Sequence, residues 1–500
     1  MIWLAWVFPR VAPVFGLLTA FAPSIGAGPI ADLPAKPRLI VMADMGNEPD
    51  EVQQMLHLLM YANRIDIEGL IACSGKYLHA DRTDGRTETR PELFHQLIDA
   101  YALVRDRLET HEPGWPKAQD LRAVVKSGTA KYGLPAVEPG HGNEASRLIE
   151  ASLLKDDPRP LYLVCNAGAN TLAQALVDVA EGRSPEAMTA ICEKIIVFEN
   201  GAQDHSGAWI AGRFPAIRWH RSNRQTYSYG GPGPANGPYT WEPFSRDPQG
   251  QHTWAEEHIV KNHGPLGALY PRREFNGRLH YIEGGGTVPW LGLTNRGLTD
   301  PERLWWGGWS GRFSRERQKN VYSRHQDIRP DEHNYKDFTM FASDSEEDVW
   351  TDQVYGETFA GPYVPVWRFR RAMMNDFRAR MDWCVLPYEE ANHPPTAALG
   401  EDRSDAIVRR SVRPGERVEL DASRSTDPDG DAIRVRWEPY PEAGTYSGEL
   451  TVADGTATRT TFAVPADAAG TEIHLLLLVN DESPIVPLTD YRRLVLTVSQ

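Results

Sequence analysis

The stretch Arg38-Leu-Ile-Val-Met-Ala-Asp-Met-Gly-Asn-Glu-Pro-Asp-Glu51 places a short apolar run directly before an acidic loop. Residues 38–43 have the length and composition of a buried strand. Residues 52–61 follow with apolar side chains at helical spacing, and residues 65–72 form a second apolar run. This order predicts a strand–helix–strand unit whose two strands run in the same direction.

The same alternation recurs further along the chain. The expected elements are a helix over 144–154, a strand over 160–165, a helix over 169–180 and a strand over 194–198. Strands that alternate with helices are typical of a mostly parallel sheet with helices on both faces. A helix over residues 367–383 is expected to close this α/β domain, which we place at residues 36–390.

The character of the sequence changes after residue 395. Short apolar or alternating runs follow, separated by turns such as Asp427-Pro-Asp-Gly430. The expected strands cover 418–421, 433–437, 460–464, 473–479 and 493–498. Short strands separated by turns over roughly 100 residues are typical of an immunoglobulin-like β-sandwich. We therefore predict a second, all-β domain at residues 396–500.

Composition restricts the classes of partner. The 500 residues carry a formal net charge of −15, which argues against nucleic acid, because nucleic acid needs a basic face. The 15 Trp and 18 Tyr residues suit sugar binding, since flat aromatic rings stack on the apolar faces of sugars. Buried core positions explain the same residues equally well. Carbohydrate is the partner that the composition favours.

The first residues of the chain have the features of an export signal, which we place at residues 1–27. The apolar run Val11–Phe21 precedes the small-residue stretch Ser24-Ile-Gly-Ala27, and prolines at positions 9, 13 and 23 argue against a membrane-spanning helix. We expect an exported protein, periplasmic or extracellular, without stable membrane insertion. In such a protein the four cysteines either form one or two disulfides or are buried apolar residues.

The acidic loop after the first strand is the first candidate site. Its carboxylates, Asp44, Glu48, Asp50 and Glu51, follow a parallel strand at the edge where α/β sheets bind ligands. Such a group can share a hard ion such as calcium, or one carboxylate can act as a general base on water. The alternative is that the later carboxylates only stabilise the N-terminus of the next helix.

Two further groups are candidates for sugar contact. Asp204, His205 and Trp209 follow the expected strand at 194–198, where Asp204 and His205 can hold hydroxyls and His205 can act as a general acid. Trp305, Trp306 and Trp309 lie with Arg312 in a glycine-rich stretch, either as a stacking platform or as a buried aromatic core. Among the scattered histidines, His263 before Gly264-Pro265 is the preferred candidate.

The acidic loop resembles the DxDPGxDD loop of nucleoside hydrolases. The chain is even more similar to the bacterial cellulose-binding-protein family, which joins a nucleoside-hydrolase-like domain to a C-terminal sandwich. Segments that carry this second resemblance include Ile67–Ala72, Asn166–Leu176, Gln203–Ile210, Gly264–Ala268, Trp306–Phe313, Ala379–Cys384, Asp421–Asp431 and Glu442–Tyr446. The resemblance covers nearly everything after residue 36.

The resemblance also implies roles for particular residues. Asp50 and Glu51 take the places of the paired aspartates of nucleoside hydrolases, one of which binds calcium, and Asp44 takes the acidic position at the strand end. Asn166 falls where a backbone carbonyl completes the calcium shell. The late aspartate of that shell is missing, because the segment reads Glu283-Gly-Gly-Gly-Thr-Val-Pro289. Either Glu283 substitutes for it or the calcium site is weakened or absent.

The leading functional hypothesis is a hydrolase acting on glycosidic or N-glycosidic bonds of a carbohydrate derived from plant or microbial polysaccharide. Its catalytic candidates are Asp44, Asp50, Asp204 and His205, its metal candidates are Asp44, Asp50, Glu51 and Asn166, and its substrate-binding candidates are Glu283, Trp209, Trp306, Trp309, Arg312 and His263. The alternative is a non-catalytic carbohydrate-binding or cellulose-binding protein. A nucleoside hydrolase is the third and least favoured hypothesis, because export and the second domain argue against salvage.

Overall fold

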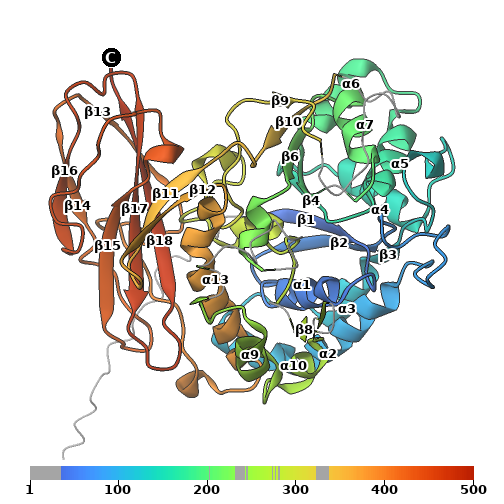
Figure 1. The fold of residues 1–500 in the computed structure, drawn as a ribbon, viewed down its shortest axis with the longest axis horizontal. Coiled ribbons are helices and arrows are strands. Elements are labelled where there is room, and N and C mark those ends of the chain that lie inside the picture. The colour runs from blue at the N-terminus through green and yellow to red at the C-terminus, as the bar shows by residue number, and fades with distance from the viewer. Residues whose placement is uncertain are drawn as a thin grey trace, which may run out of the picture. The chain divides into compact units, whose positions relative to one another are not determined.

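The computed structural model of the chain describes residues 35–500, apart from residues 202, 231–242, 244–245, 273, 276–277, 280–281 and 323–336. Residues Lys36–Gln500 belong to one compact unit (Figure 1). The expected export signal at residues 1–27 lies outside the described residues.

An eight-stranded sheet forms the centre of the α/β part, with the order β3-β2-β1-β4-β5-β6-β10-β9. Its strands are β1 Arg38–Ala43, β2 Asp66–Ala72, β3 Val125–Ser127, β4 Leu161–Cys165, β5 Ile195–Asn200, β6 Arg218–Ser222, β9 Gln318–Lys319 and β10 Thr339–Ala342. Neighbouring strands run parallel except β9 and β10. The predicted mostly parallel sheet is therefore confirmed.

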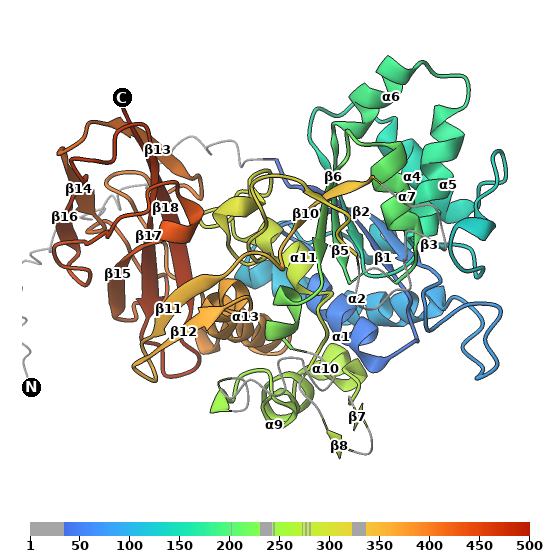
Figure 2. The same ribbon diagram turned by 45° about the horizontal axis from the view of Figure 1, so that its top comes forward.

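Helices cover both faces of this sheet. The described helices of the α/β part are α1 Pro49–Leu59, α2 Pro91–His111, α3 Ala118–Ala123, α4 Glu144–Leu153, α5 Ala169–Ala180, α6 Pro185–Cys192, α7 Ser206–Arg213, α9 His252–Ala255, α10 Gly264–Leu269, α11 Val288–Leu291 and α13 Val364–Trp383. Figure 2 shows α4, α5 and α7 on one side of the sheet and α1 and α2 on the other.

Strand β1 shows how the sheet is held between these layers. Leu39, Val41 and Ala43 join one apolar core with α1, α2 and α13. Ile40 and Met42 join the other core with α4 and α5. Alternate residues of a strand point to opposite faces, so a strand buried on both sides has to be apolar throughout. This requirement explains why Arg38–Ala43 reads as a continuous apolar run.

The segment between β6 and α13 is less regular. Its described elements besides the helices include a π-helical turn at Glu256–Val260, the hairpin of β7 Glu274–Phe275 and β8 Arg278–Leu279, and the hairpin of β11 Asp348–Asp352 and β12 Glu357–Gly361. Helix α9 continues directly into the π-helical turn.

The C-terminal part is a β-sandwich, as predicted. Its strands are β13 Val408–Val412, β14 Arg417–Asp421, β15 Ile433–Pro439, β16 Arg459–Ala463, β17 Glu472–Asp481 and β18 Thr489–Val498. One sheet has the order β13-β18-β17-β15, and β14 pairs with β16 in the other. The two sheets enclose an apolar core of their own.

The larger sheet of the sandwich is buried on both faces. Along β17, Leu475 and Leu477 point into the core of the sandwich. Leu476 and Leu478 point the other way and join the core of the α/β part, together with Trp306. The sandwich is therefore packed against the α/β part through a second apolar face.

Arg493 of β18 strengthens this junction. Its buried guanidinium donates to the backbone carbonyls of Leu298 at 2.7 Å, Trp306 at 2.8 Å and Gly307 at 2.9 Å. Burial lowers the pKa of Arg493 to about 10. A buried cation that satisfies three carbonyls fixes the position of β18 against these loops.

The connection between the two parts is also buried. The Trp383 indole donates to the carbonyl of Asn392 at 2.8 Å, and the Asn392 amide donates to Asp481 at 2.9 Å. Residues 401–406 beyond it are exposed. The residues between the two predicted domains are thus anchored to the sandwich, and the exposed part of the chain begins at residue 401.

All four cysteines, Cys73, Cys165, Cys192 and Cys384, are buried and free, so no disulfide joins them. The sequence left two alternatives for the cysteines, and the structure supports the second, in which they are buried apolar residues. Within the described part of the chain, no helix is long and apolar enough to cross a membrane.

We expect limited proteolysis to cut within residues 401–406, and not at Asn392 or His393, because only the former residues are exposed. The two fragments should stay associated through the buried faces of β17 and β18. Mass spectrometry locates the cut, and size-exclusion chromatography before and after denaturation tests the association. A first cut at Asn392, or fragments that separate without denaturant, would contradict the expectation.

Candidate functional site

Polar groups gather at the carboxyl edge of the main sheet, where β1 and β4 lie side by side. The strand order runs from β1 to β2 and β3 in one direction and from β4 to β5 and β6 in the other. Such a reversal leaves a crevice beyond the strand ends, where α/β sheets bind ligands. Asp44 follows β1 directly and Asn166 follows β4 directly, so both lie at this crevice.

The Asp44 carboxyl is buried, with 1% of its surface exposed. Its Oδ2 atom has no hydrogen-bond partner among the described residues. Burial raises the pKa of Asp44 to about 7, and the negative charges of Asp50 and Glu48 add to this rise. Near neutral pH the group is therefore only partly ionised.

A chain of amides connects the two loops. The Gln54 Nε2 atom donates to Asp50 Oδ2 at 3.0 Å, and the Asn166 Nδ2 atom donates to Gln54 Oε1 at 3.1 Å. Asn166 Nδ2 also lies 3.3 Å from the carbonyl of Gly286. The Asn166 Oδ1 atom is buried and has no hydrogen-bond partner among the residues described. One carboxylate and two side-chain amides thus form a hydrogen-bonded row across the crevice.

The glycines at 284–286 close this side of the crevice. A Cβ atom added at Gly284 would lie 2.2 Å from Asp50 Oδ2, and one at Gly286 would lie 2.2 Å from Gln54 Oε1. A Cβ at Gly285 would lie 2.6 Å from Asn200 Oδ1. The backbone approaches the polar groups so closely that only glycine fits. In this arrangement there is no room for an aspartate side chain.

Glu51 has a local structural role. It accepts a hydrogen bond from the backbone N–H of Glu48 at 2.8 Å, as part of the cap of α1. Burial, followed by the charge of Asp50, raises the pKa of Glu51 well above its usual range. Pro49 at the first helical position also favours this helix start. The helix-capping alternative thus applies to Glu51.

The same loop contains possible metal ligands. Carboxylate oxygens of Glu48, Asp50 and Glu51 lie within 4.8 Å of one another. Together with Asp44 Oδ2 and Asn166 Oδ1, these oxygens fit a hard cation such as calcium in kind. The segment 284–286 adds no carboxylate to the set.

Glu283 lies next to this segment, but its side chain points elsewhere. It accepts hydrogen bonds from Thr287 and from Tyr270 at 3.1 Å, and it contacts His57 Nδ1 at 3.1 Å. The residue is completely buried. The expectation that Glu283 replaces the missing aspartate or touches substrate is not kept, because these internal partners occupy its carboxylate.

Asp204 belongs to the same edge of the sheet but has backbone partners. It accepts from the backbone N–H groups of Ser206 at 2.7 Å and Asn170 at 3.1 Å. Burial raises the pKa of Asp204 to about 6. Burial raises the pKa of the Cys73 thiol well above its usual range, and the charges of Asp44 and Asp204 add to this rise.

His205 and Trp209 lie further out. The Leu134 N–H donates to His205 Nε2 at 3.3 Å, and the imidazole lies edge-on to Tyr132. Trp209 on α7 is half-buried and lies edge-on to Phe214. His205 therefore contacts the loop before η1 Leu134–Ala136, and Trp209 packs on its own helix.

The tryptophans of the glycine-rich stretch lie at the junction with the sandwich. The Trp306 indole donates to Glu472 at 3.1 Å, and Trp309 lies edge-on to Tyr491. Arg312 donates to Asp348 at 2.8 Å and to the carbonyl of Glu347 at 2.9 Å. All three are buried. The expected sugar-stacking platform at these residues is therefore corrected to an internal packing surface.

His263 is also used internally. Its Nε2 atom lies 2.8 Å from Asp382 on α13, and 7% of the residue is exposed. The contact ties the start of α10 to α13, so the expected role in substrate binding is not kept.

Sequence reasoning missed several polar residues of the crevice. Gln54 lies one helical turn after Asp50 on a buried face of α1, and Thr226 donates to Asn200 Oδ1 at 2.9 Å. A glutamine at a position where the helix pattern requires an apolar residue was a usable signal for Gln54. Thr226 lies in a 3₁₀ turn, Gln225–Ser228, for which the sequence has no periodic pattern.

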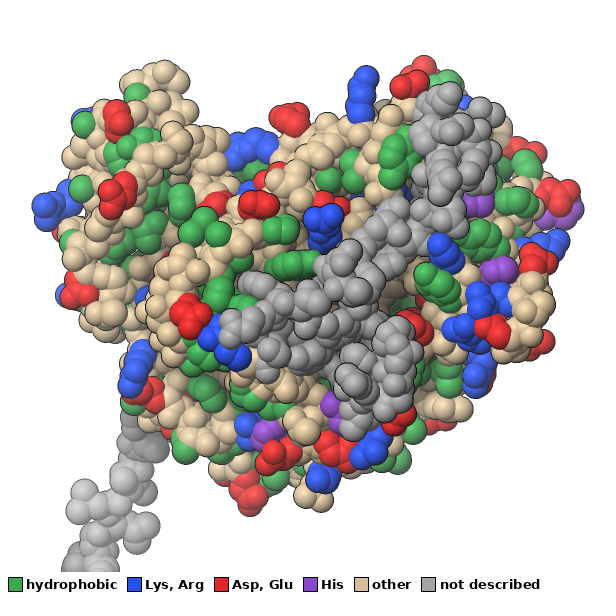
Figure 3. Space-filling model, viewed as in Figure 1, with side chains coloured by type: hydrophobic (Ala, Val, Ile, Leu, Met, Phe, Trp, Pro, Cys, Tyr) green, Lys and Arg blue, Asp and Glu red, His purple; other side chains and the backbone are tan. Residues whose placement is uncertain are grey.

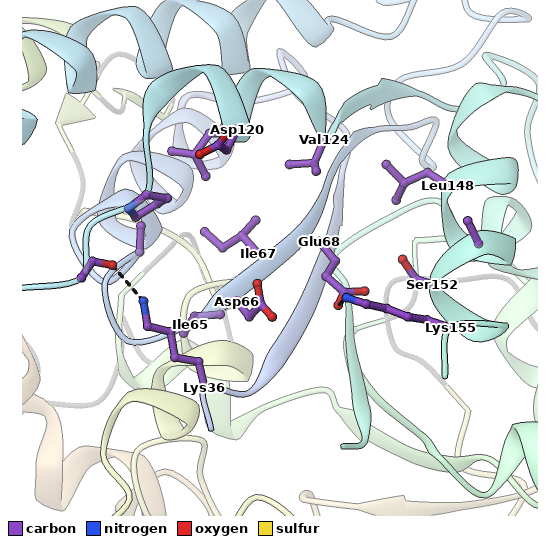
Figure 4. A pocket seen from close by; sticks show the side chains of 15 residues that line it. Lys36, Ile65, Asp66, Ile67, Glu68, Asp120, Val124, Leu148, Ser152 and Lys155 are labelled. Carbon is purple, nitrogen blue, oxygen red and sulfur yellow. Dashed lines mark hydrogen bonds and ion pairs between the residues drawn. The ribbon is translucent and has the colours of Figure 1, made fainter. Parts of the chain in front are cut away.

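A separate hollow lies at the opposite, amino-terminal edge of the sheet (Figure 4). It has a volume of about 550 Å³, with Ile67, Val124 and Leu148 on its walls. Figure 4 shows Lys155 extended toward Glu68, and the two form an ion pair at 2.8 Å. These two charges thus neutralise each other within the hollow. Charges of both signs are also interspersed over the face shown in Figure 3.

Comparisons with known proteins agree with this architecture. The family model for the cellulose-binding Sde182 nucleoside hydrolase-like domain matches residues 38–313, and the model for the C-terminal domain of cellulose-binding protein Sde0182 matches residues 417–498. Comparison with the curated proteins finds no match.

Among solved structures, the chain is similar to a nucleoside hydrolase-related protein from Saccharophagus degradans that is described as associated with carbohydrate metabolism. The identity is 30%, the TM-score is 0.76, and the match covers 93% of this chain and 100% of that chain. An effector protein, XOO4466, matches with 12% identity and a TM-score of 0.31 over 71% of this chain and 95% of that one, which is too low to indicate a shared fold.

We expect the contribution of Asp44 to the stability of the protein to become less favourable as pH rises from about 4 to about 7. The Asp44 pKa is raised from 3.8 to about 7, so the folded state holds a proton that the unfolded state releases in this window. Asp44→Asn should therefore match the wild type near pH 4 and be more stable above pH 7, by on the order of 2–4 kcal/mol.

Urea unfolding across this pH range measures the difference. Asp106→Asn is the control, because the Asp106 side chain is 95% exposed and its substitution should leave the pH profile unchanged. A wild-type stability that rises steadily from pH 4 to pH 7, relative to Asp44→Asn, would refute the raised pKa.

Proposed function

Because the chain belongs to the cellulose-binding Sde182 family, we propose that it is an exported carbohydrate-binding protein whose nucleoside-hydrolase-like domain holds a sugar without cleaving it. The observation that carries the proposal is the crevice between Asp44 and Asn166, where two buried oxygen atoms have no hydrogen-bond partner among the described residues. Buried polar atoms are nearly always hydrogen-bonded, so a polar ligand is the natural partner for them.

The chemistry of the crevice favours a neutral, polyhydroxylated ligand. Asn166 and Gln54 provide amide groups, and Asp44 and Asp50 provide carboxyl groups. Neighbouring hydroxyls of a sugar both donate and accept, so they can bind such a mixed set of amides and carboxyls. The negative charges of Asp50 and Glu48 disfavour an anionic ligand.

Several features argue against efficient hydrolysis. The third position of the DxDPGxDD loop is an aspartate, whereas this chain has Gly46 there, with φ of +87°. A side chain at Gly46 would be strained, and its Cβ would lie 3.0 Å from Arg90 Cγ. The glycines at 284–286 add no carboxylate to the crevice. The chain therefore lacks acidic groups at two positions where the motif implies them.

The other catalytic candidates are committed to internal contacts. Asp204 accepts two backbone N–H groups, and His205 accepts one. A general acid or base needs access to the substrate and a pKa near the working pH. The pKa of Asp204 lies near the working pH, but the backbone hydrogen bonds of its carboxylate leave it without access to a substrate.

Hydrolysis of a glycosidic or N-glycosidic bond remains the second candidate, and Asp44 is the observation that favours it. A buried carboxyl with a pKa of about 7 is suited to proton transfer at neutral pH. A screen for released reducing sugar and released nucleobase tests this candidate directly. Release that Asp44→Asn abolishes would replace the binding proposal by the catalytic one.

Export to the periplasm or the extracellular medium is part of the proposal and rests on the apolar segment and small residues before position 28. Processing after Ala27 in the native host, read by N-terminal sequencing of the mature protein, is the test.

We expect the wild type to bind cellohexaose and to release no sugar from it. Asn166→Ala removes both the unpaired Oδ1 atom and the contact to Gln54, so it should weaken binding at this site by about tenfold. Isothermal titration calorimetry measures affinity, with Asp106→Asn as the control that should bind like the wild type. Equal affinity of Asn166→Ala and wild type would place sugar binding outside the crevice.

We also expect weak binding of calcium by the acidic loop. A dissociation constant on the order of 10⁻³ M is typical of weak extracellular sites, and about 10 mM calcium would then stabilise the fold by about 1.4 kcal/mol. Thermal unfolding of chelator-treated protein should show a higher melting temperature with calcium for the wild type and not for Asp50→Asn. An unchanged wild-type melting temperature would mean that the loop functions without the ion.

A further inference from the structure

A groove lies where the sandwich and the α/β part diverge, away from the carboxyl edge. Its volume is about 370 Å³, at the lower end of the range for small-ligand sites and sufficient for about two hexose units. Three elements form its walls: α13, the hairpin β11–β12, and the outer face of the sandwich sheet.

The sheet wall presents its side chains in register. Arg434 pairs with Asn480, and Asn480 pairs with Thr489, so one polar row crosses three strands. Arg436, Leu478 and Tyr491 form the next row in the same way. Neighbouring strands are about 4.8 Å apart, which is comparable with the length of one sugar ring.

The helical wall is formed by one face of α13. Trp367 and Arg371 are four residues apart, as are Arg368 and Ala372, so all four line the groove together. Asn375 follows on the same face and donates to the carbonyl of Pro487 at 3.0 Å. This contact ties the end of the groove to the sandwich.

The hairpin supplies an available aromatic ring. Trp350 lies on the same face of β11 as the buried Asp348 and Asp352, so its indole faces the groove and not the solvent side of β11. The indole is half-buried, and no hydrogen bond or ring contact engages it within the described part of the chain. Val354 at the turn of the hairpin is 66% exposed and extends the apolar edge.

The arginines of the groove are already paired with carboxylates. Arg371 lies 3.1 Å from Asp352 and 3.4 Å from Asp247, and Arg368 lies 3.4 Å from Glu438. Arg436 also pairs with Glu438, and Arg434 pairs with Glu482. An anionic ligand would have to compete with these carboxylates, whereas a neutral ligand can use the donors and acceptors as they stand.

We propose that this groove is a second carbohydrate site, which binds a short neutral oligosaccharide with one ring stacked on Trp350 and its hydroxyls on Arg371, Arg436 and Asn480. The site goes beyond the crevice of the proposed function, because it is built jointly by both parts of the protein. The groove exists only while β17 and β18 stay packed on the α/β part, so this binding site depends on the junction.

Calorimetric titration of the full chain with cellohexaose tests the proposal. Trp350→Ala should remove one of two binding sites or weaken that site about tenfold or more, and Trp350→Phe should restore much of the affinity. Val349→Ala is the matched control, because Val349 is the neighbouring residue on the opposite face of β11 and is 60% exposed. Its affinity and stoichiometry should equal those of the wild type.

The outcomes separate the groove from the crevice. If Trp350→Ala binds like the wild type, the groove is not a sugar site, and the crevice proposal stands or falls with Asn166→Ala. If Asn166→Ala binds like the wild type while Trp350→Ala does not, the groove is supported and the crevice is not. Binding of oligogalacturonate at the groove in preference to cellohexaose would overturn the assignment of a neutral ligand.

Discussion

The reversal of strand order between β1 and β4 is the constraint on which the functional part of the structure depends. It directs the loops after these strands to opposite sides, and it places Asp44 and Asn166 at the crevice between them. The crevice is then filled by polar groups from three separate segments, including Gln54 on α1 and the backbone of Gly284–Gly286. Carboxyl groups in this space lose their water, and the raised pKa of Asp44 follows from that loss.

The sandwich is packed tightly against the α/β part, whereas an appended binding module is joined only through a linker. A module on a linker presents one face of its sheet to solvent, where it can bind a polymer. Here that face meets Trp306, Trp309 and α13, and Arg493 donates to three backbone carbonyls across the junction. Any surface for carbohydrate on the sandwich has to lie at the margin of the junction or on the smaller sheet.

Local sequence patterns predicted the large elements, because these depend on periodicity. Residues 38–72, the helices at 144–154 and 169–180, and the strands of the sandwich except β13 could be located. Helix α2 was missed although Phe94, Leu97, Tyr101 and Leu108 recur at helical spacing. The hairpin β11–β12 was missed because only Asp348 and Asp352 of β11 are fully buried, so it lacks an apolar stripe.

The site was predictable where a carboxylate follows a strand, and it was not predictable where partners come from distant segments. Asp44 and Asp50 were placed at the correct edge. The orientation of the Glu283 side chain depends on its contacts with His57, Tyr270 and Thr287, and no local sequence pattern predicts that these residues meet. The tryptophans at 306 and 309 were ambiguous for the same reason, since stacking on sugar and packing on another domain require the same residue type.

The double-sided burial of β17 has a consequence for how the chain finds its pairing. The run Leu475–Leu478 places leucine on both faces, so shifting the strand by one residue would exchange leucine for leucine and change the apolar pattern very little. The residues that flank the leucines determine the register of the strand. His474 contacts Arg493 at 3.1 Å, and Asp481 accepts from the N–H of Leu488 at 2.9 Å. A shifted strand would turn His474 into the sandwich core, so a few polar atoms at its ends select the native alignment of this strand.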